Sequence, residues 1–382
     1  MNILTLNKIS KLGTSRFSDN YVVNDTVENP EGILVRSANM HEYEMPESLL
    51  AIARAGAGVN NIPVDACAEK GIVVFNTPGA NANAVKELAL AALLLSCRDI
   101  VAGVKWAEGL TGDDVAKQVE KGKSQFVGPE IMGKKLGVIG LGAIGVNVAN
   151  AAEALGMKVY GYDPFLSIKS AWSLSHNVQM STLNEIYAEC DFISIHAPLT
   201  PDTKEFINKT SIALMKDGVR ILNLARGGLV HNADMAAALE EGKVAKYVTD
   251  FPDAEVLAMK NALCIPHLGA STPESEDNCA VMAVDQMKEY LEHGNIINSV
   301  NFPTVEMPRT GKVRLCIFHK NVPAILSGIS SQIAQENINI SNMINKSKGD
   351  FAYTVVDCDN DVSDDNIKDI AAVDGVIRIR AI

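Results

Sequence analysis

Three glycines near the middle of the chain have a spacing that can hold the phosphates of a dinucleotide. Gly140, Gly142 and Gly145 form G-x-G-x-x-G directly after the apolar run KLGVI and before a segment with helical apolar spacing. The first glycine allows a tight turn, the second lets the pyrophosphate approach the backbone, and the third lets helix and strand pack closely. The N–H groups of Ala143 and Ile144, which begin the helix, would bind the phosphates.

An acidic residue at the end of the next apolar run indicates which dinucleotide is bound. Asp163 closes the run MKVYGYD, and a carboxylate at this distance after the glycines accepts hydrogen bonds from the ribose hydroxyls. A carboxylate also repels a 2′-phosphate, so the sequence predicts NAD rather than NADP. The alternative is a Rossmann-like domain that binds no nucleotide and uses its glycines only for turns.

Oxidation of an alcohol with a nicotinamide cofactor also requires a group that takes the hydroxyl proton and a cation that holds the substrate. Arg226, Glu255 and His267 lie near the ends of apolar runs. An arginine can grip a carboxylate with two hydrogen bonds, and Glu255 beside His267 would stabilise the imidazolium. The plainer interpretations are a surface arginine in a turn, a solvated carboxylate and a structural histidine.

The segments that must position these residues alternate between strand and helix patterns. Residues 1 to about 98 do so, 99–134 resemble a connection, and 275–294 predict a long amphipathic helix. The central part predicts a doubly wound parallel sheet from six apolar runs, at 135–145, 157–163, 191–198, 220–226, 246–252 and 262–267. After a linker-like stretch at 298–312, residues 313–382 predict strand, helix, strand, strand, helix, strand, which is the ferredoxin-like α+β order.

Composition excludes several classes of protein. The chain has 382 residues and a formal net charge of −12, which disfavours a nucleic-acid surface. No apolar run approaches the length of a membrane span, and the first residues do not form a signal peptide. Seven cysteines are scattered without a CxxC pair, so we expect reduced thiols, no metal site and a cytoplasmic location.

Several ordered motifs resemble one family. GLGAIG with Asp163, HAPLTPDT (196–203), LNLARGGLV (222–230), TDFPDAE (249–255) and PHLGAST (266–272) are similar to those of the D-isomer-specific 2-hydroxyacid dehydrogenases. The resemblance implies that Arg226 binds the substrate, that His267 transfers the proton and that Glu255 is its carboxylate partner. It also implies a set of cofactor contacts beyond the glycine loop: His196, Ala197, Pro198, Thr203, Leu224, Ala225, Asp250, Gly269 and Ala270.

The resemblance assigns substrate contacts to the first part of the chain. The motifs VRSA (35–38), RAGAGVNN (54–61) and NTPGANANAVKEL (76–88) contain these candidates: Arg36, Ser37, Arg54, Ala57, Gly58 and Asn81. Two departures from the family concern Glu255. Val256 stands where a proline often follows the glutamate, and the interval to His267 is shorter than in many members.

The resemblance also implies a domain organisation. A discontinuous, flavodoxin-like substrate-binding domain would comprise residues 1–97 and 275–305, with a Rossmann-like NAD-binding domain over 98–274 inserted into it. Catalysis would take place in the cleft, with hinge closure excluding water. Helices within 87–130 would form a dimer interface, so a homodimer or homotetramer is expected.

Residues 313–382 resemble an ACT domain, a small module that senses amino acids. His319, Asn321 and Asn339 match positions that contact an L-serine effector in regulated members of the family. Ala324 departs from the usual Pro-Gly, and its methyl group would hinder close approach of a ligand to the backbone. The alternative is a module that only aids assembly.

The implied reaction is NAD-dependent oxidation of 3-phosphoglycerate to 3-phosphohydroxypyruvate. Two alternatives remain open on the sequence. One is a reductase of another 2-oxo acid, such as hydroxypyruvate, glyoxylate or 2-oxoglutarate. The other is a non-enzymatic NAD-sensing corepressor, against which the three catalytic candidates and the appended module argue.

Overall fold

We describe a computed structural model that covers all 382 residues. The chain folds into two compact units. The inner unit is the continuous stretch 81–272, and the outer unit combines 1–80 with 273–382. The predicted boundary at residue 97 differs from the one in the structure, because the helix that precedes it packs on the inner unit.

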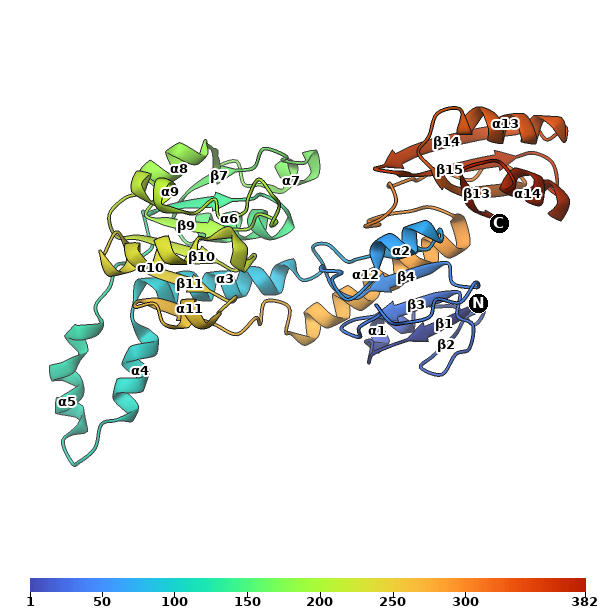
Figure 1. Ribbon diagram of the computed structural model, residues 1–382. Coiled ribbons are helices and arrows are strands. Elements are labelled where there is room, and N and C mark those ends of the chain that lie inside the picture. The colour runs from blue at the N-terminus through green and yellow to red at the C-terminus, as the bar shows by residue number, and fades with distance from the viewer. The chain divides into compact units, whose positions relative to one another are not determined.

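The inner unit is built on a seven-stranded sheet of order β12-β11-β10-β9-β6-β7-β8 (Figure 1). All neighbouring strands are parallel. The strands are β6 (Lys135–Ile139), β7 (Lys158–Tyr162), β8 (Gln179–Met180), β9 (Phe192–Ile195), β10 (Val219–Asn223), β11 (Val244–Thr249) and β12 (Ala262–Cys264). The doubly wound prediction is confirmed, and the short β8 is the strand that it lacked.

Helices cover both faces of this sheet, because its strands alternate apolar residues between two cores. Phe192 and Leu222 face the helices α3 (Ala82–Cys97) and α6 (Ala143–Ala154). Ile193 and Ile221 face α8 (Leu183–Glu189), α9 (Lys209–Leu214) and α10 (Asn232–Glu240). Three further short helical segments accompany the sheet: α7 (Ile168–Ser173), η2 (Gly227–Leu229) and α11 (Ala254–Leu257).

The segment predicted as a connection at 99–134 is largely helical. It contains α4 (Ile100–Glu108), α5 (Val115–Gly122) and the 3₁₀ turn η1 (Lys123–Phe126), which together leave the sheet as an arm (Figure 1). None of the residues of these three elements is buried. Apolar residues do occur in these elements, but several of them, such as Ile100, Val104 and Val115, stay exposed.

The outer unit contains a five-stranded parallel sheet of order β2-β1-β3-β4-β5. This is the flavodoxin-like order that the resemblance implies. Its elements are β1 (Asn2–Thr5), α1 (Lys11–Thr14), β2 (Val22–Asn24), β3 (Gly32–Val35), β4 (Ala51–Arg54), α2 (Val64–Glu69), β5 (Val73–Phe75) and the long α12 (Pro273–His293). One face packs on α12 and the other on α2.

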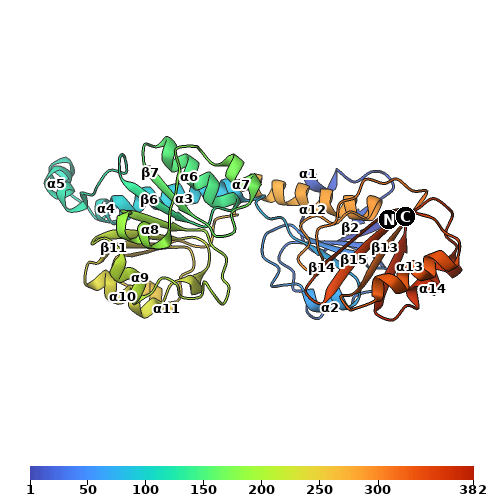
Figure 2. The ribbon, with the colours of Figure 1, turned by 90° about the horizontal axis from the view of Figure 1, so that it is seen from above.

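The C-terminal module of the outer unit is an antiparallel sheet of order β14-β15-β13-β16. Its elements occur in the predicted order: β13 (Val313–Lys320), α13 (Ile325–Gln335), β14 (Ile340–Lys348), β15 (Phe351–Cys358), α14 (Asp364–Ala371) and β16 (Val376–Ala381). Helices α13 and α14 cover one face of this sheet (Figure 2). The other face, with Phe318 and Tyr353, joins the core that includes α12.

Polar side chains of the module hold the end of α12. Arg314 Nη1 donates to the carbonyl of His293 (2.8 Å) and Tyr353 Oη to that of Gly294 (2.7 Å). Arg314 is itself buried and pairs through two hydrogen bonds (2.7 and 2.9 Å) with the buried carboxylate of Asp357. The last carbonyls of the helix, which lack partners within it, are thus satisfied by the module.

The substitution Asp357→Asn is expected to destabilise the outer unit by roughly 3–5 kcal/mol, because it leaves a buried arginine without its counter-charge. Burial alone would raise the pKa of Asp357, but hydrogen bonds from Arg314 and Thr310 hold it below its usual value. The pair's contribution is therefore present above about pH 4 and is lost as the pH falls further. Thermal unfolding across this pH range measures it.

The matched control for this prediction is Asp361→Asn, which breaks the exposed ion pair with Lys312 in the same module. This change should leave the melting temperature almost unaltered, since exposed pairs contribute little. Equal melting temperatures for both variants would contradict the role given to Asp357.

The structure also bears on membrane spans and metal sites. None of the helices is both long and apolar enough to span a lipid bilayer. The structure brings together no group of three or more histidine, cysteine, aspartate or glutamate side chains suited to a metal ion.

Candidate active site

The glycine loop lies where β6 leads into α6. Gly140 has a φ of 93°, a conformation that favours glycine, and a Cβ there would come within 2.7 Å of the His196 backbone. A Cβ on Gly145 would meet the carbonyl oxygen of Gly140 at 1.8 Å. Gly142 has open space around it, next to the N–H groups of Ala143 and Ile144 that begin α6. The loop is therefore shaped for close approach of a phosphate.

Asp163 follows β7 and lies against this loop. Its Oδ2 accepts a hydrogen bond from the N–H of Leu141 and its Oδ1 from the N–H of Phe165, both at 2.8 Å. These contacts hold the carboxylate beside the glycine turn, which is the place required for a contact with a ribose hydroxyl.

The HAPLTPDT segment follows β9 at the same edge of the sheet. Burial lowers the pKa of His196 to about 4, so the ring is neutral at physiological pH, and its Nε2 lies 2.8 Å from Ser194 Oγ. Ala197 borders Gly140. Thr203 Oγ1 donates to the carbonyl of Pro198 (2.7 Å), which keeps the segment compact.

Asp250 is the clearest sign of a ligand in the inner unit. It is only 2% exposed, and its Oδ1 has no hydrogen-bond partner. Burial raises the pKa of Asp250, and the nearby charges of His267 and Arg226 oppose the shift. A Cβ on Gly269 would lie 3.9 Å from Asp250 Oδ2. A buried acceptor without a donor fits the amide N–H₂ of a nicotinamide.

Arg226 and His267 both lie near one aromatic ring, that of Phe251. The Arg226 guanidinium carbon is 6.0 Å from the centroid of the Phe251 ring, and the His267 ring centroid is 4.6 Å from it. Arg226 Nη1 also donates to the carbonyl of Ala225 (2.7 Å), just beyond the buried Leu224. Sequence reasoning did not single out Phe251, because an aromatic residue after an aspartate carries no chemical signature.

The predicted pair of Glu255 and His267 is not formed in the structure. Glu255 Oε2 instead accepts a hydrogen bond from Asn232 Nδ2 (3.1 Å), which also donates to Asp253 Oδ2 (3.0 Å). Glu255 lies in the first turn of α11, and Asp253 is the N-cap residue of that helix. The Asn232 side chain therefore holds both carboxylates, and sequence reasoning did not anticipate it.

Two arginines lie at the carboxyl edge of the outer unit's parallel sheet. Arg36 follows β3 and Arg54 ends β4, and Val35 pairs with Arg54 in register. Arg54 Nε donates to the carbonyl of Arg36 (3.0 Å). A Cβ on Gly56 would come within 2.5 Å of Arg54 Nη1. Arg36 Nη2 forms an ion pair with Glu276 Oε1 (2.7 Å), so a substrate anion there competes with this carboxylate.

The loops that carry the other substrate candidates are held by asparagines. Asn7 Oδ1 accepts from the N–H groups of Arg36, Ser37 and Ala38 (2.9–3.0 Å). Asn76 Nδ2 donates to the carbonyl of Ala57 (2.6 Å), next to Gly58. The sequence analysis did not single out Asn7. It follows shortly after the carboxyl end of β1, and residues at this end of a parallel strand often contact ligands.

Asn81 belongs to the inner unit, where it is the N-cap residue of α3. Its carbonyl accepts a hydrogen bond from the N–H of Val85 (3.1 Å). Among the six substrate candidates from the first part of the chain, Asn81 alone lies in the inner unit, and the other five lie in the outer unit.

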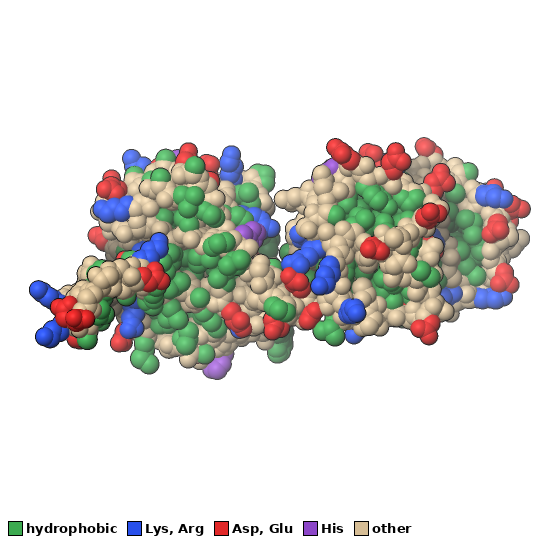
Figure 3. Space-filling view, turned by 90° about the horizontal axis from the view of Figure 1, so that it is seen from below, with side chains coloured by type: hydrophobic (Ala, Val, Ile, Leu, Met, Phe, Trp, Pro, Cys, Tyr) green, Lys and Arg blue, Asp and Glu red, His purple; other side chains and the backbone are tan.

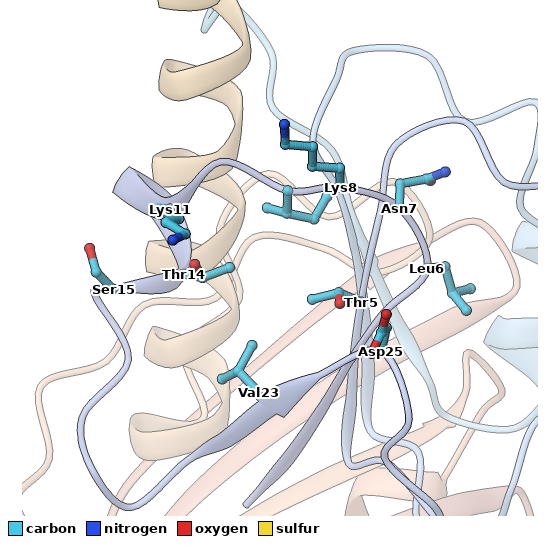
Figure 4. Close-up of a pocket in the computed structure, with 10 residues that line it drawn as sticks. Thr5, Leu6, Asn7, Lys8, Lys11, Thr14, Ser15, Val23 and Asp25 are labelled. Carbon is cyan, nitrogen blue, oxygen red and sulfur yellow. The ribbon is translucent and has the colours of Figure 1, made fainter.

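A pocket of about 940 Å³ lies beside β1, α1 and β2 in the outer unit (Figure 4). None of the predicted site residues lines it. Its lining consists of Thr5, Leu6, Asn7, Lys8, Ile9, Lys11, Thr14, Ser15, Val23 and Asp25.

The three effector candidates of the module already have partners within the protein. His319 is 1% exposed and contacts Thr354 Oγ1 through Nε2 (2.8 Å). Asn321 Nδ2 donates to the carbonyl of Gly349 (3.0 Å), and Asn339 Nδ2 to the carboxylate of Asp359 (2.6 Å). An effector would have to replace these hydrogen bonds.

Comparisons with known proteins identify the family of the chain. Residues 90–269 match the family model of the D-isomer specific 2-hydroxyacid dehydrogenase NAD-binding domain. Two similar curated proteins are both D-3-phosphoglycerate dehydrogenases. The one from Methanocaldococcus jannaschii is 34% identical over 84% of this chain and 60% of its own length. The one from Haemophilus influenzae is 31% identical over 94% of this chain and 88% of its own.

A solved structure is similar as well. It is the NAD⁺-bound 3-phosphoglycerate dehydrogenase of Entamoeba histolytica, with a TM-score of 0.58, 26% identity, and coverage of 79% of this chain and 98% of that one. The protein belongs to the D-isomer specific 2-hydroxyacid dehydrogenase family. It is accordingly an NAD-dependent oxidoreductase.

Proposed function

We propose that the protein oxidises 3-phospho-D-glycerate to 3-phosphohydroxypyruvate, the first step of serine biosynthesis by the phosphorylated route. One observation carries the proposal. Arg226 and His267 both lie near Phe251 and near the buried carboxylate of Asp250, whose Oδ1 has no hydrogen-bond partner, in a chain whose curated relatives above are D-3-phosphoglycerate dehydrogenases. Its seven unpaired cysteines support a cytoplasmic location.

The roles of the residues follow from their chemistry. Bound NAD⁺ supplies the acceptor for the hydride from C2. Arg226 binds the carboxylate and the developing carbonyl oxygen of the substrate with its two-pronged guanidinium. His267 takes the proton of the C2 hydroxyl at its imidazole nitrogen.

Other residues of the chain bind and orient. Asp250 Oδ1 accepts from the nicotinamide amide, the N-terminus of α6 binds the pyrophosphate, and Asp163 binds the ribose. Arg36 and Arg54 bind the phosphate and carboxylate of the substrate. Glu255 supports the imidazolium once its side chain leaves Asn232, and until then Asp250 is the carboxylate whose charge acts on His267.

Steady-state kinetics test this function. We expect turnover of 3-phosphoglycerate with NAD⁺, and of 3-phosphohydroxypyruvate with NADH, at a higher kcat/KM than for hydroxypyruvate, glyoxylate or 2-oxoglutarate. Absence of turnover with both phosphorylated compounds would refute the proposal. A rate with one of the other oxo acids would then identify a related reductase, and no rate at all would favour a non-enzymatic NAD sensor.

The substitution Asp163→Asn is expected to raise the KM for NAD⁺ by roughly ten- to a hundredfold, because hydrogen bonds to a charged acceptor contribute about 1.5–3 kcal/mol. It should also reduce the preference for NAD⁺ over NADP⁺, since the repulsion of a 2′-phosphate is removed. The control is Asp217→Asn, an exposed aspartate of the same unit that pairs with Lys243. An unchanged cofactor preference would exclude Asp163 from the ribose site.

The exposed apolar residues of the arm favour association of the protein into dimers or tetramers. Several large apolar side chains in and around it are exposed, and apolar side chains gather on this face of the inner unit (Figure 3). They are Leu94, Ile100, Val104, Val115, Val127 and Met132. Single apolar residues on a surface are ordinary, but a group of this size is typical of an interface.

L-Serine is the effector proposed for the ACT-like module, with His319, Asn321 and Asn339 as its contacts. Ala324 has a φ of 67°, which costs a residue with a Cβ roughly 1–2 kcal/mol. Ala324→Gly should therefore raise the melting temperature slightly and lower the serine concentration for half-inhibition roughly tenfold. Absence of any response to serine in both proteins would favour a module that only aids assembly.

A further inference from the structure

We propose that Phe251 is a positioning residue of the active site, whose ring sets the places of Arg226 and His267 relative to each other. This inference rests on the proposed roles of Arg226 and His267, and it adds a residue of the TDFPDAE segment to which the sequence analysis gave no role. Its basis is that the Phe251 ring lies near both side chains within the inner unit.

The first observation is how little else holds the two catalytic candidates. His267 is exposed and makes no hydrogen bond or ion pair in the structure, and its ring contact with Phe251 is at 4.6 Å with planes 51° apart. The side chain of Arg226 has one hydrogen bond, to the carbonyl of its own neighbour Ala225. Besides the Asp250 carboxylate, which the charges of both residues influence, the Phe251 ring is the side chain that lies near both.

The second observation is that Phe251 is itself firmly placed. It follows Asp250, which is almost fully buried, and its N–H donates to Thr249 Oγ1 (3.2 Å). Gly227 packs close to Phe251, since a Cβ at Gly227 would lie 3.4 Å from the Cβ of Phe251. Phe251 is half-buried.

The third observation concerns charge. An aromatic face attracts both guanidinium and imidazolium through its quadrupole. Glu255 is held by Asn232, so the charged group that acts on the imidazole is Asp250, and the phenyl ring is its aromatic contact. The Phe251 ring therefore limits where the imidazole and the guanidinium can lie, so that a carboxylate and a hydroxyl of one substrate can reach both.

The test uses three variants of the full-length protein. Phe251→Leu keeps an apolar side chain but removes the π face, Phe251→Tyr keeps the face, and Phe251→Ala removes both. For Phe251→Leu we expect kcat to fall about three- to tenfold, with the NAD⁺ dissociation constant unchanged. The limb of the pH–kcat profile near neutrality should move to lower pH by roughly half a unit, because the protonated imidazole loses a favourable contact.

Phe251→Tyr should restore kcat and the pH profile to within about twofold of the parent, and Phe251→Ala should lose more activity than Phe251→Leu. The matched control is Phe17→Leu in the outer unit, which removes a similar half-buried aromatic pair with Tyr21 (4.7 Å). This control should leave kcat and the pH profile unaltered.

Two results would overturn the inference. One is a folded Phe251→Leu variant whose kcat and pH profile match the parent. The other is a loss that appears in NAD⁺ affinity alone, which would mean that the ring serves only the cofactor. All variants are assayed with whichever 2-hydroxy acid the parent oxidises best, so failure of phosphoglycerate as a substrate would refute the proposed function and leave this test intact.

Discussion

The substitution Arg226→Gln is expected to lower kcat/KM for 3-phosphoglycerate by about 10²–10³-fold and to leave the NAD⁺ dissociation constant unchanged. Glutamine has no charge and cannot donate two parallel hydrogen bonds to a carboxylate, and losing one partner of such a contact costs about 2–5 kcal/mol. Steady-state kinetics give the first quantity and calorimetric titration with NAD⁺ the second.

Arg226→Lys separates charge from geometry. Lysine keeps the charge but is a single point donor, so it should recover only part of the loss. Activity of the glutamine variant close to that of the parent would remove Arg226 from the substrate site. A parallel loss of NAD⁺ affinity would assign it to the cofactor instead.

The substitution His267→Asn is expected to lower kcat by about 10²–10⁴-fold, which is the usual contribution of a positioned acid–base group. Asparagine has a similar shape close to the backbone but does not exchange a proton. The variant should therefore also lose the titration of kcat near neutral pH, whereas NAD⁺ binding should persist. Measurement of kcat at a series of pH values, with saturating substrate, tests both expectations.

His176→Asn provides the control for this variant, because His176 lies in an exposed loop of the same unit. It should behave like the parent at every pH. A neutral limb that survives in His267→Asn would show that another group accepts the proton.

The order of the helices and strands could be predicted because burial of one face places apolar residues at regular intervals in the sequence. The strands of the inner sheet are buried on both faces, so they appear as short apolar runs, and α12 appears as an amphipathic helix. The residues at 99–134 suggested only a connection, and helices within 87–130 were expected from the family resemblance alone; α4 and α5 have no buried residues. The boundary between the two units near residue 80 was also missed. The sequence of α3 predicts a helix, but it does not indicate on which unit that helix packs.

The candidate site could be predicted only in part. Gly140, Gly145 and Asp163 were found because their roles depend on local backbone geometry, which leaves a fixed spacing in the sequence. Arg226 and His267 were found from strand ends together with a family resemblance. The partner of Glu255 was expected to be His267, yet the structure gives Asn232, which is far away in sequence.

By itself, the sequence determined the two parallel sheets, the ferredoxin-like module, the dinucleotide loop and the positions of the catalytic candidates. These depend on alternation, spacing and strand ends, all of which are properties of short stretches of chain. Only the tertiary structure decided that Phe251 lies near both Arg226 and His267, that Asp250 is left with an unpartnered oxygen, and that Arg314 holds the end of α12. These depend on which side chains of separate strands and helices meet, and the packing of the core sets those distances.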